Sequence, residues 1–148
     1  MSFRVITRFS LATAFCFQTW AFGSVPLELH TLTVVVEGVS NSKGVVGVLV
    51  FNSAAGWPEE FSAALRAKSA PAHPGVTEIT IPGLPAGDYA VVVLHDENEN
   101  KKLDRGPLGI PIEQWGMSNN PSYSLSAPSF HSARFRLEND ERISVRLH

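Results

Sequence analysis

The sequence predicts an all-β protein, an antiparallel β-sandwich of six or seven short strands with one short helix and one long ordered loop. Apolar residues recur at every second position through most of the chain, as they do in strands that bury one face. Clusters of Gly and Pro separate these segments, which is typical of the turns in a sandwich. Helical periodicity is almost absent, so the pattern does not favour an α/β fold.

Six segments carry the strand pattern. They are Thr31 to Val39, Val45 to Phe51, Val76 to Ile81, Tyr89 to Leu94, Ala133 to Leu137 and Ile143 to Leu147. The second segment is apolar on both faces, which suits a central strand. Asn41 to Gly44 predicts a turn, and Pro82 to Gly87 is expected to break the third segment from the fourth. The residues expected between the two sheets are Leu32, Val34, Val36, Val48, Val50, Ile79, Ile81, Val91, Val93, Phe135, Leu137, Val145 and Leu147.

A short amphipathic helix is predicted from Pro58 to Lys68. Proline suits the first turn of a helix, and the two glutamates that follow lie at the positive end of the helix dipole. Phe61 and Leu65 are four residues apart and share a face. The favoured interpretation is a crossover that covers an edge of the sheet, and the alternative is a helix that binds a partner.

The N-terminal segment is interpreted as a signal peptide that covers residues 1–23. Arg4 and Arg8 precede an apolar run, and Ala21 to Gly23 places small residues where a signal peptidase cleaves. The apolar run is about 14 residues, shorter than the ~20 that cross a bilayer, so a membrane anchor is the weaker alternative. We therefore expect an exported protein, periplasmic or secreted, with one β-sandwich domain over residues 24–148 and no stable membrane insertion.

The charge and the cysteine count exclude several function classes. Removal of residues 1–23 leaves ten basic and 14 acidic residues, a net charge of −4 with neutral histidines. Nucleic acid is not an expected partner, because it calls for a clustered basic face. The sole cysteine, Cys16, lies in the predicted signal peptide, so thiol chemistry and cysteine-ligated metals are not expected in the mature chain.

A long stretch without periodicity runs from His95 to about Ser129. Unstructured connections of this length are uncommon unless they are functional or disordered. Its many aliphatic and aromatic residues argue against disorder, and its Gly and Pro residues define turns. We interpret it as an ordered loop held by the sandwich, which is where binding tends to reside.

Side-chain oxygens alternate at the start of this loop in a pattern that resembles a calcium site. Asp96, Asn98, Asn100 and Asp104, together with the Lys102 carbonyl, would supply about five to seven oxygens, against the 6 to 8 that calcium takes. Glu113 or water would complete the shell. The alternative is a polar loop in which Asp and Asn side chains bond their own backbone.

Three residues of the loop are candidate ligand contacts: His95, Glu113 and Trp115. His95 ends a strand beside Asp96, but adjacent strand residues point to opposite faces, so a structural histidine is the favoured interpretation. Trp115 would stack on a sugar or a peptide, or would simply anchor the loop.

The blocks LTVVVEGV, GVVGVLVF, LPAGDYAVVVLHDEN, KLD, LGIP, WGMSNN and PSFHSARF follow one another along residues 30–148. In this order they resemble the small exported bacterial proteins grouped as domain of unknown function family 2141. The resemblance implies an exported β-sandwich with a conspicuous loop and no established activity. The chain departs from the family at Glu99 and Lys101, where glycines are common. LPAGDYAVVV is also similar, more distantly, to transthyretin-like (prealbumin) and carboxypeptidase-regulatory sandwiches.

Two function classes follow. The first is a binding or structural module of unknown biochemical activity that acts on an unidentified protein or small molecule through the long loop, with calcium as its candidate cofactor. The second is a small hydrolase or metal-dependent enzyme that uses His95, Asp96 and Glu113. The sequence contains no nucleophile elbow, no paired-histidine zinc helix and no phosphate loop, so it favours the module over an enzyme.

Overall fold

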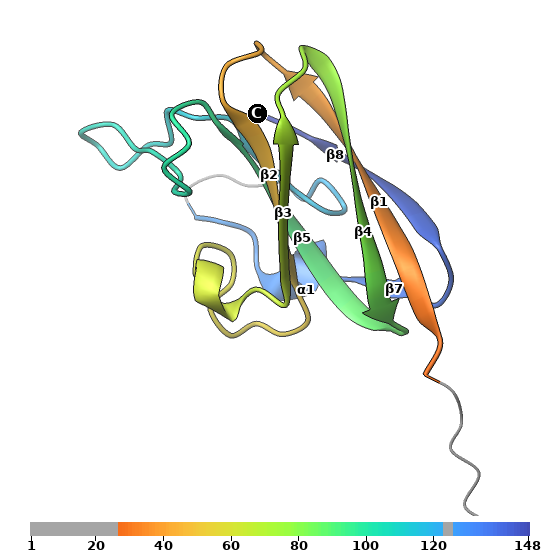
Figure 1. Ribbon diagram of the computed structural model, residues 1–148. Coiled ribbons are helices and arrows are strands. Elements are labelled where there is room, and N and C mark those ends of the chain that lie inside the picture. Colours follow the sequence, from red (N-terminus) through yellow and green to blue (C-terminus); the bar gives the residue numbers. More distant parts are fainter. Residues whose placement is uncertain (1–26, 123–125) are drawn as a thin grey trace, which may run out of the picture.

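The computed structural model describes residues 27–122 and 126–148, and the predicted signal peptide lies outside the described residues. Eight strands form two facing sheets (Figure 1). The first sheet has the order β4-β1-β8 and the second β3-β2-β5-β6, with β7 paired to β5. The strands are β1 (Leu29–Val39), β2 (Val45–Phe51), β3 (Arg66–Pro71), β4 (Gly75–Pro85), β5 (Gly87–Asp96), β6 (Trp115–Met117), β7 (Phe135–Leu137) and β8 (Glu141–Arg146). The all-β sandwich is confirmed.

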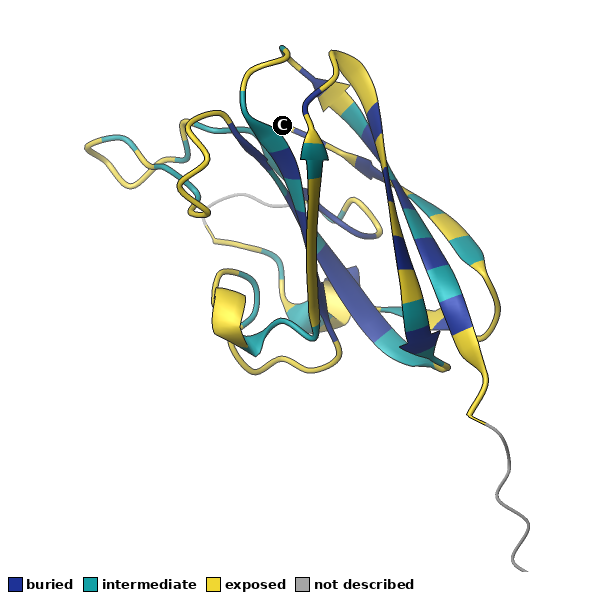
Figure 2. Cartoon of the chain, viewed as in Figure 1, coloured by how far each residue is buried: buried dark blue, intermediate teal, exposed yellow. Residues whose placement is uncertain are grey.

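The core lies between the two sheets. Alternate residues of β1 and β4 are buried, which gives the striped strands of Figure 2. Of the thirteen residues predicted for the core, all are buried except Phe135, which is partly buried and packs against the others. The period-two pattern of apolar residues therefore identified the inner faces correctly, because side chains alternate across a strand whatever its partners are.

The strand pairs are antiparallel with one exception. β8 runs parallel to β1, with Leu32 opposite Glu141 and Val36 opposite Val145. Only three residues separate β7, which pairs with β5, from β8, so the chain changes sheets at one end of the sandwich. The Thr31 amide donates to the Asp140 side chain at 2.7 Å across this crossing. The first sheet is therefore mixed, whereas the sequence predicted an antiparallel one.

The helix predicted from Pro58 to Lys68 is wrong over most of its length. A 3-10 helix, η1, covers only Phe61–Ala63. The last turn of the predicted helix, from Arg66 to Lys68, belongs instead to strand β3. β3 pairs with β2 along its whole length, and most of its residues are exposed. An exposed edge strand needs no apolar alternation, which explains why periodicity did not reveal it.

Three further elements differ from the predictions. β4 continues through Pro82 and ends at Pro85, with a register shift against β1 between His30 and Leu32. β6 pairs with β5 inside the segment predicted to be irregular. A short helix α1 (Phe130–Ala133) precedes β7, and the Ser129 side chain accepts from the Ser132 amide at its start.

Two long connections lie on the same side of the second sheet, away from the first sheet (Figure 1). One is the 52–65 segment between β2 and β3, and the other is the 97–114 loop between β5 and β6. Trp57 fixes the first of these. Its ring contacts Phe51 and Phe130 edge-on, with centroids 5.3 Å and 5.8 Å away, and its Nε1 donates to the Pro128 carbonyl at 2.9 Å. The outer face of the second sheet is thus bordered by ordered segments.

Candidate ligand-binding site

His95 fastens the end of β5 to the neighbouring strands. The side chain is fully buried, and its Nε2 donates to the Lys43 carbonyl at 2.9 Å, since a carbonyl only accepts. Its Nδ1 lies 3.3 Å from Gln114 Oε1. That glutamine also accepts from the Ser40 amide and donates to the Gly38 carbonyl. The buried His95 side chain therefore belongs to a network that joins the β1–β2 turn to the long loop.

The predicted calcium ligands come together, largely through hydrogen bonds to the backbone. Asp96 is buried, and its two carboxylate oxygens accept from the amides of Asn100 at 3.1 Å and Lys101 at 2.7 Å. Asn98 Oδ1 also accepts from the Asn100 amide, and Asn100 Oδ1 accepts from the Lys102 amide at 2.8 Å. Side-chain oxygens that accept from the backbone two residues on form Asx turns. These bonds hold the loop in a compact turn.

Asp104 and Glu113 close the other side of the turn. Asp104 accepts from the side-chain amides of Asn98 at 2.6 Å and Asn100 at 2.9 Å. Glu113 accepts from the backbone amides of Glu97 at 3.1 Å and Asp104 at 3.0 Å. In the described part of the chain, no three His, Cys, Asp or Glu side chains group as metal ligands do. Each carboxylate oxygen that accepts one hydrogen bond keeps a further lone pair, and the calcium site stays a prediction.

The turn contains two residues in the left-handed backbone region. Glu99 has φ 61° and Lys101 has φ 62°, a conformation that normally favours glycine. These are the two positions at which the family resemblance led us to expect glycine. The chain thus forms the expected turn without glycines, at a cost in backbone strain.

Beyond this turn the loop forms a small hairpin over residues 104–112. Arg105 and Pro111 form an isolated β-bridge, and Gly106 donates to the Ile110 carbonyl at 2.9 Å. Leu108 is 86% exposed and Ile110 63% exposed. Exposed aliphatic residues gathered on an ordered loop commonly mark a binding surface.

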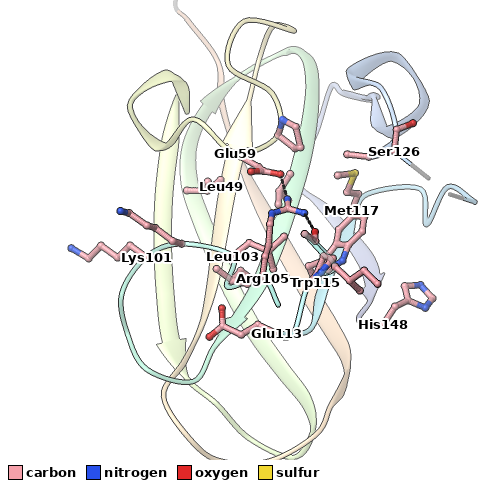
Figure 3. A pocket seen from close by; sticks show the side chains of 18 of the residues that line it. Leu49, Glu59, Lys101, Leu103, Arg105, Glu113, Trp115, Met117, Ser126 and His148 are labelled. Atoms are coloured by element: carbon pink, nitrogen blue, oxygen red, sulfur yellow. Dashed lines mark hydrogen bonds and ion pairs between the residues drawn. The ribbon is translucent and has the colours of Figure 1, made fainter. Parts of the chain in front are cut away.

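A pocket of about 790 Å³ lies between this loop and the outer face of the second sheet, and we name it the sheet-face pocket (Figure 3). Side chains from β2, β5 and β6 form its floor, namely Leu49, Val92, Leu94, Trp115 and Met117. Leu103, Arg105, Leu108 and Ile110 of the loop border it on one side, and Pro58 and Glu59 on another. Ser126, Ala127 and His148 also contribute. The volume falls within the ~300–1,000 Å³ typical of ligand sites.

An ion pair connects two borders of the sheet-face pocket. Arg105 donates to the Glu59 carboxylate and, through Nη1, to the Gly109 carbonyl at 3.1 Å. The two interactions lie at the centre of Figure 3. The guanidinium therefore joins the hairpin to the 52–65 segment and orders the wall of the pocket.

Of the predicted contact residues, Glu113 and Trp115 border the sheet-face pocket, together with the Lys102 side chain, whereas His95 and Asp96 do not. The alternative enzyme site of His95, Asp96 and Glu113 is therefore not gathered in this pocket. Sequence reasoning missed the floor residues Leu49, Val92 and Leu94. The sequence pattern that could have revealed them is the strand from Val45 to Phe51. It is apolar on both faces, so its outer face also needs a covering segment or a ligand.

The block WGMSNN has a structural role after Trp115. Ser118 is buried, accepts from the Val91 amide at 2.9 Å and donates to the Ala133 carbonyl at 2.6 Å. Asn120 accepts from the Arg146 amide at 2.8 Å and donates to the Ser144 carbonyl at 3.1 Å, so it occupies part of the free edge of β8. These bonds join the segment after β6 to β5, to helix α1 and to strand β8.

The fold and the pocket define a β-sandwich protein with a loop-bordered pocket on the outer face of one sheet. The chain belongs to the DUF2141 family, described as an uncharacterized protein conserved in bacteria, whose model matches residues 34–144. No curated protein and no solved structure matches the chain. Among the described residues, no helix has the length and apolar character needed to span a membrane.

Proposed function

We propose that this protein is an exported binding module that holds a small ligand in the sheet-face pocket. The observation that carries the proposal is the pocket itself. Sandwich sheets usually expose a polar outer face, but here Leu49, Val92 and Leu94 present apolar side chains on that face. Ordered loops surround them and leave a volume suited to a ligand.

The architecture of the loop supports a binding role. His95, Asp96 and Glu113 hold the base of the loop by hydrogen bonds, and Arg105 ties its hairpin to the 52–65 segment. A site held in this way loses little conformational entropy when a ligand binds. The rigid sandwich and the anchored loop together thus present a largely formed pocket.

A neutral fluorescent probe tests the pocket. N-phenyl-1-naphthylamine brightens in apolar surroundings, and we expect saturable binding to the folded protein. The double variant Leu108→Asp with Ile110→Asp should bind the probe about tenfold more weakly, or worse. Each aliphatic side chain contributes about 1.5–3 kcal/mol when fully buried, and aspartate removes this contribution. Both side chains are largely exposed, so the fold should be retained.

The matched control is Val76→Asp. Val76 is another exposed aliphatic residue, 52% exposed, but it lies on β4 of the other sheet and does not border the pocket. Its replacement should leave probe binding unchanged. Absence of saturable binding to the unmodified protein, or equal losses in all variants, would overturn the proposal.

Export is the second part of the proposal. It is supported by Arg4, Arg8 and the small residues at Ala21 and Gly23, which all belong to the part of the chain outside the described residues. N-terminal sequencing of protein recovered outside the cytoplasm should begin at or near Ser24. An intact Met1 on cytoplasmic protein would contradict it.

Calcium is proposed as an accessory ligand of the 96–104 turn. The supporting observation is that the four predicted side chains, those of Asp96, Asn98, Asn100 and Asp104, are joined in one hydrogen-bonded cluster. This turn precedes the hairpin that borders the sheet-face pocket, so a bound ion would order that wall. The proposed binding role does not depend on it.

A further inference from the structure

The charge distribution around the sheet-face pocket carries information about its ligand. Three cations, Lys101, Lys102 and Arg105, and two side-chain carboxylates, Glu59 and Glu113, border it. Arg105 is paired with Glu59. Glu113 uses both oxygens to accept backbone amides of the loop. The carboxylates are therefore already engaged within the protein.

The two lysines differ from Arg105 in this respect. Their backbone amides bond Asp96 and Asn100, but within the described part of the chain neither ammonium group forms an ion pair. Lys101 lies at one side of the pocket and His148 at the opposite side (Figure 3). One rim thus offers two exposed cations beside an apolar floor.

Two of the apolar side chains of the loop that border the pocket are exposed to solvent. Leu108 and Ile110 border the pocket while most of their surface is exposed to solvent. Burial of such side chains is favourable because it removes apolar surface from water. A ligand that extends from the lysines along this wall would therefore gain apolar contacts as well as a charge partner.

We propose that the ligand of the sheet-face pocket is a small amphipathic acid, with an apolar body over Leu94 and Trp115 and an acid group at Lys101 and Lys102. This inference rests on the proposed binding function and adds the chemical class of the ligand. The acid group would be a carboxylate, sulfonate or phosphate, because a compact ammonium binds each of them as a point charge.

A matched pair of probes tests the charge preference. N-phenyl-1-naphthylamine and 8-anilinonaphthalene-1-sulfonate share the same ring system and differ by one sulfonate. We expect the sulfonate to bind about fivefold more tightly, because exposed charge pairs are typically worth up to ~1 kcal/mol. The double variant Lys101→Gln with Lys102→Gln should remove this preference, so that the ratio of the two probes' Kd values falls to about one.

Lys43→Gln is the matched control. Its side chain is 75% exposed and lies outside the pocket, so its loss should leave the preference intact. Equal binding of both probes to the unmodified protein would overturn the acid proposal while leaving the binding function standing. Failure of both probes to bind would overturn the binding function itself.

Two further measurements define the ligand class. Dodecanoate should displace the bound sulfonate probe, and dodecyltrimethylammonium, which has the same chain length and the opposite charge, should displace it at least about fivefold less well. Sedimentation with vesicles of phosphatidylglycerol and phosphatidylcholine distinguishes a free acid from a membrane surface. The protein should stay in the supernatant. If it instead sediments with the vesicles, and the lysine double variant does not, then Lys101 and Lys102 bind lipid headgroups rather than a free acid.

Discussion

The Nε2 nitrogen of His95 lies 2.9 Å from the carbonyl oxygen of Lys43, so a fully buried imidazole at the end of β5 ties the turn between β1 and β2 to the start of the long loop. The Gln114 side chain extends the same network to Ser40 and Gly38. The base of the 97–114 loop is therefore held by side-chain bonds to backbone groups of β1 and of the turn that follows it.

Replacement of His95 by leucine should destabilise the protein by about 1–2 kcal/mol, because the buried imidazole would no longer donate its partly buried hydrogen bond to the Lys43 carbonyl. Urea denaturation measures this change. Lys43→Ala is the control, since it keeps the carbonyl and removes only an exposed side chain. A decrease in the free energy of unfolding of less than about 0.5 kcal/mol would contradict the prediction and show that water can replace the imidazole as donor.

Glu99→Gly and Lys101→Gly should each stabilise the protein by about 0.5–1 kcal/mol. Non-glycine residues with positive φ cost about 1–2 kcal/mol, and the larger unfolded-state entropy of glycine offsets part of that gain. Lys102→Gly, at a neighbouring position without positive φ, should instead be neutral or destabilising. Thermal melting of the three variants compares these effects, and similar shifts in all three would remove the strain argument.

Calcium at about 100 times its Kd should stabilise the folded protein by about 2.7 kcal/mol, if it binds only the folded state, and should raise the melting temperature by several degrees. Asp104→Asn should abolish the rise. The Asp104 carboxylate accepts bonds only from side-chain amides, whereas the Asp96 carboxylate accepts from backbone amides of the turn, so Asp104 is the cleaner test.

Asp88→Asn controls for the loss of a carboxylate elsewhere, because Asp88 pairs with Arg134 and Arg136 on the surface. It should leave the calcium response intact. A melting curve that millimolar calcium does not move would reduce the 96–104 segment to a polar turn.

Tyr89→Phe should cost about 1 kcal/mol at neutral pH, because the tyrosine hydroxyl donates to the Pro85 carbonyl at 2.8 Å. Burial raises the pKa of Tyr89 above its ordinary value of 10.0. The folded state thus favours the neutral phenol, so its stabilising effect is full below pH 10 and is lost as the pH rises through the folded-state pKa. Denaturation at a series of alkaline pH values should show the wild type losing its advantage over the variant.

The sequence determined the strands that carry an apolar inner face at every second residue. β1, β2, β5 and β8 were predicted close to their observed bounds, and twelve of the thirteen proposed core residues are buried. The position of the long loop and the residues that form its hydrogen bonds could also be predicted from the sequence, because Asp and Asn at alternating positions favour local turns. These features depend on neighbours along the chain.

Tertiary structure alone decided the elements that depend on distant partners. The sequence RAKSAP of β3 has no apolar period and becomes a strand because the edge of β2 supplies its hydrogen bonds. The parallel pairing of β8 follows from the crossing between sheets after β7. The sheet-face pocket exists only where the outer faces of β2 and β5 meet the loop hairpin and the 52–65 segment. No local pattern encodes such a meeting, since it depends on the packing of segments far apart in sequence.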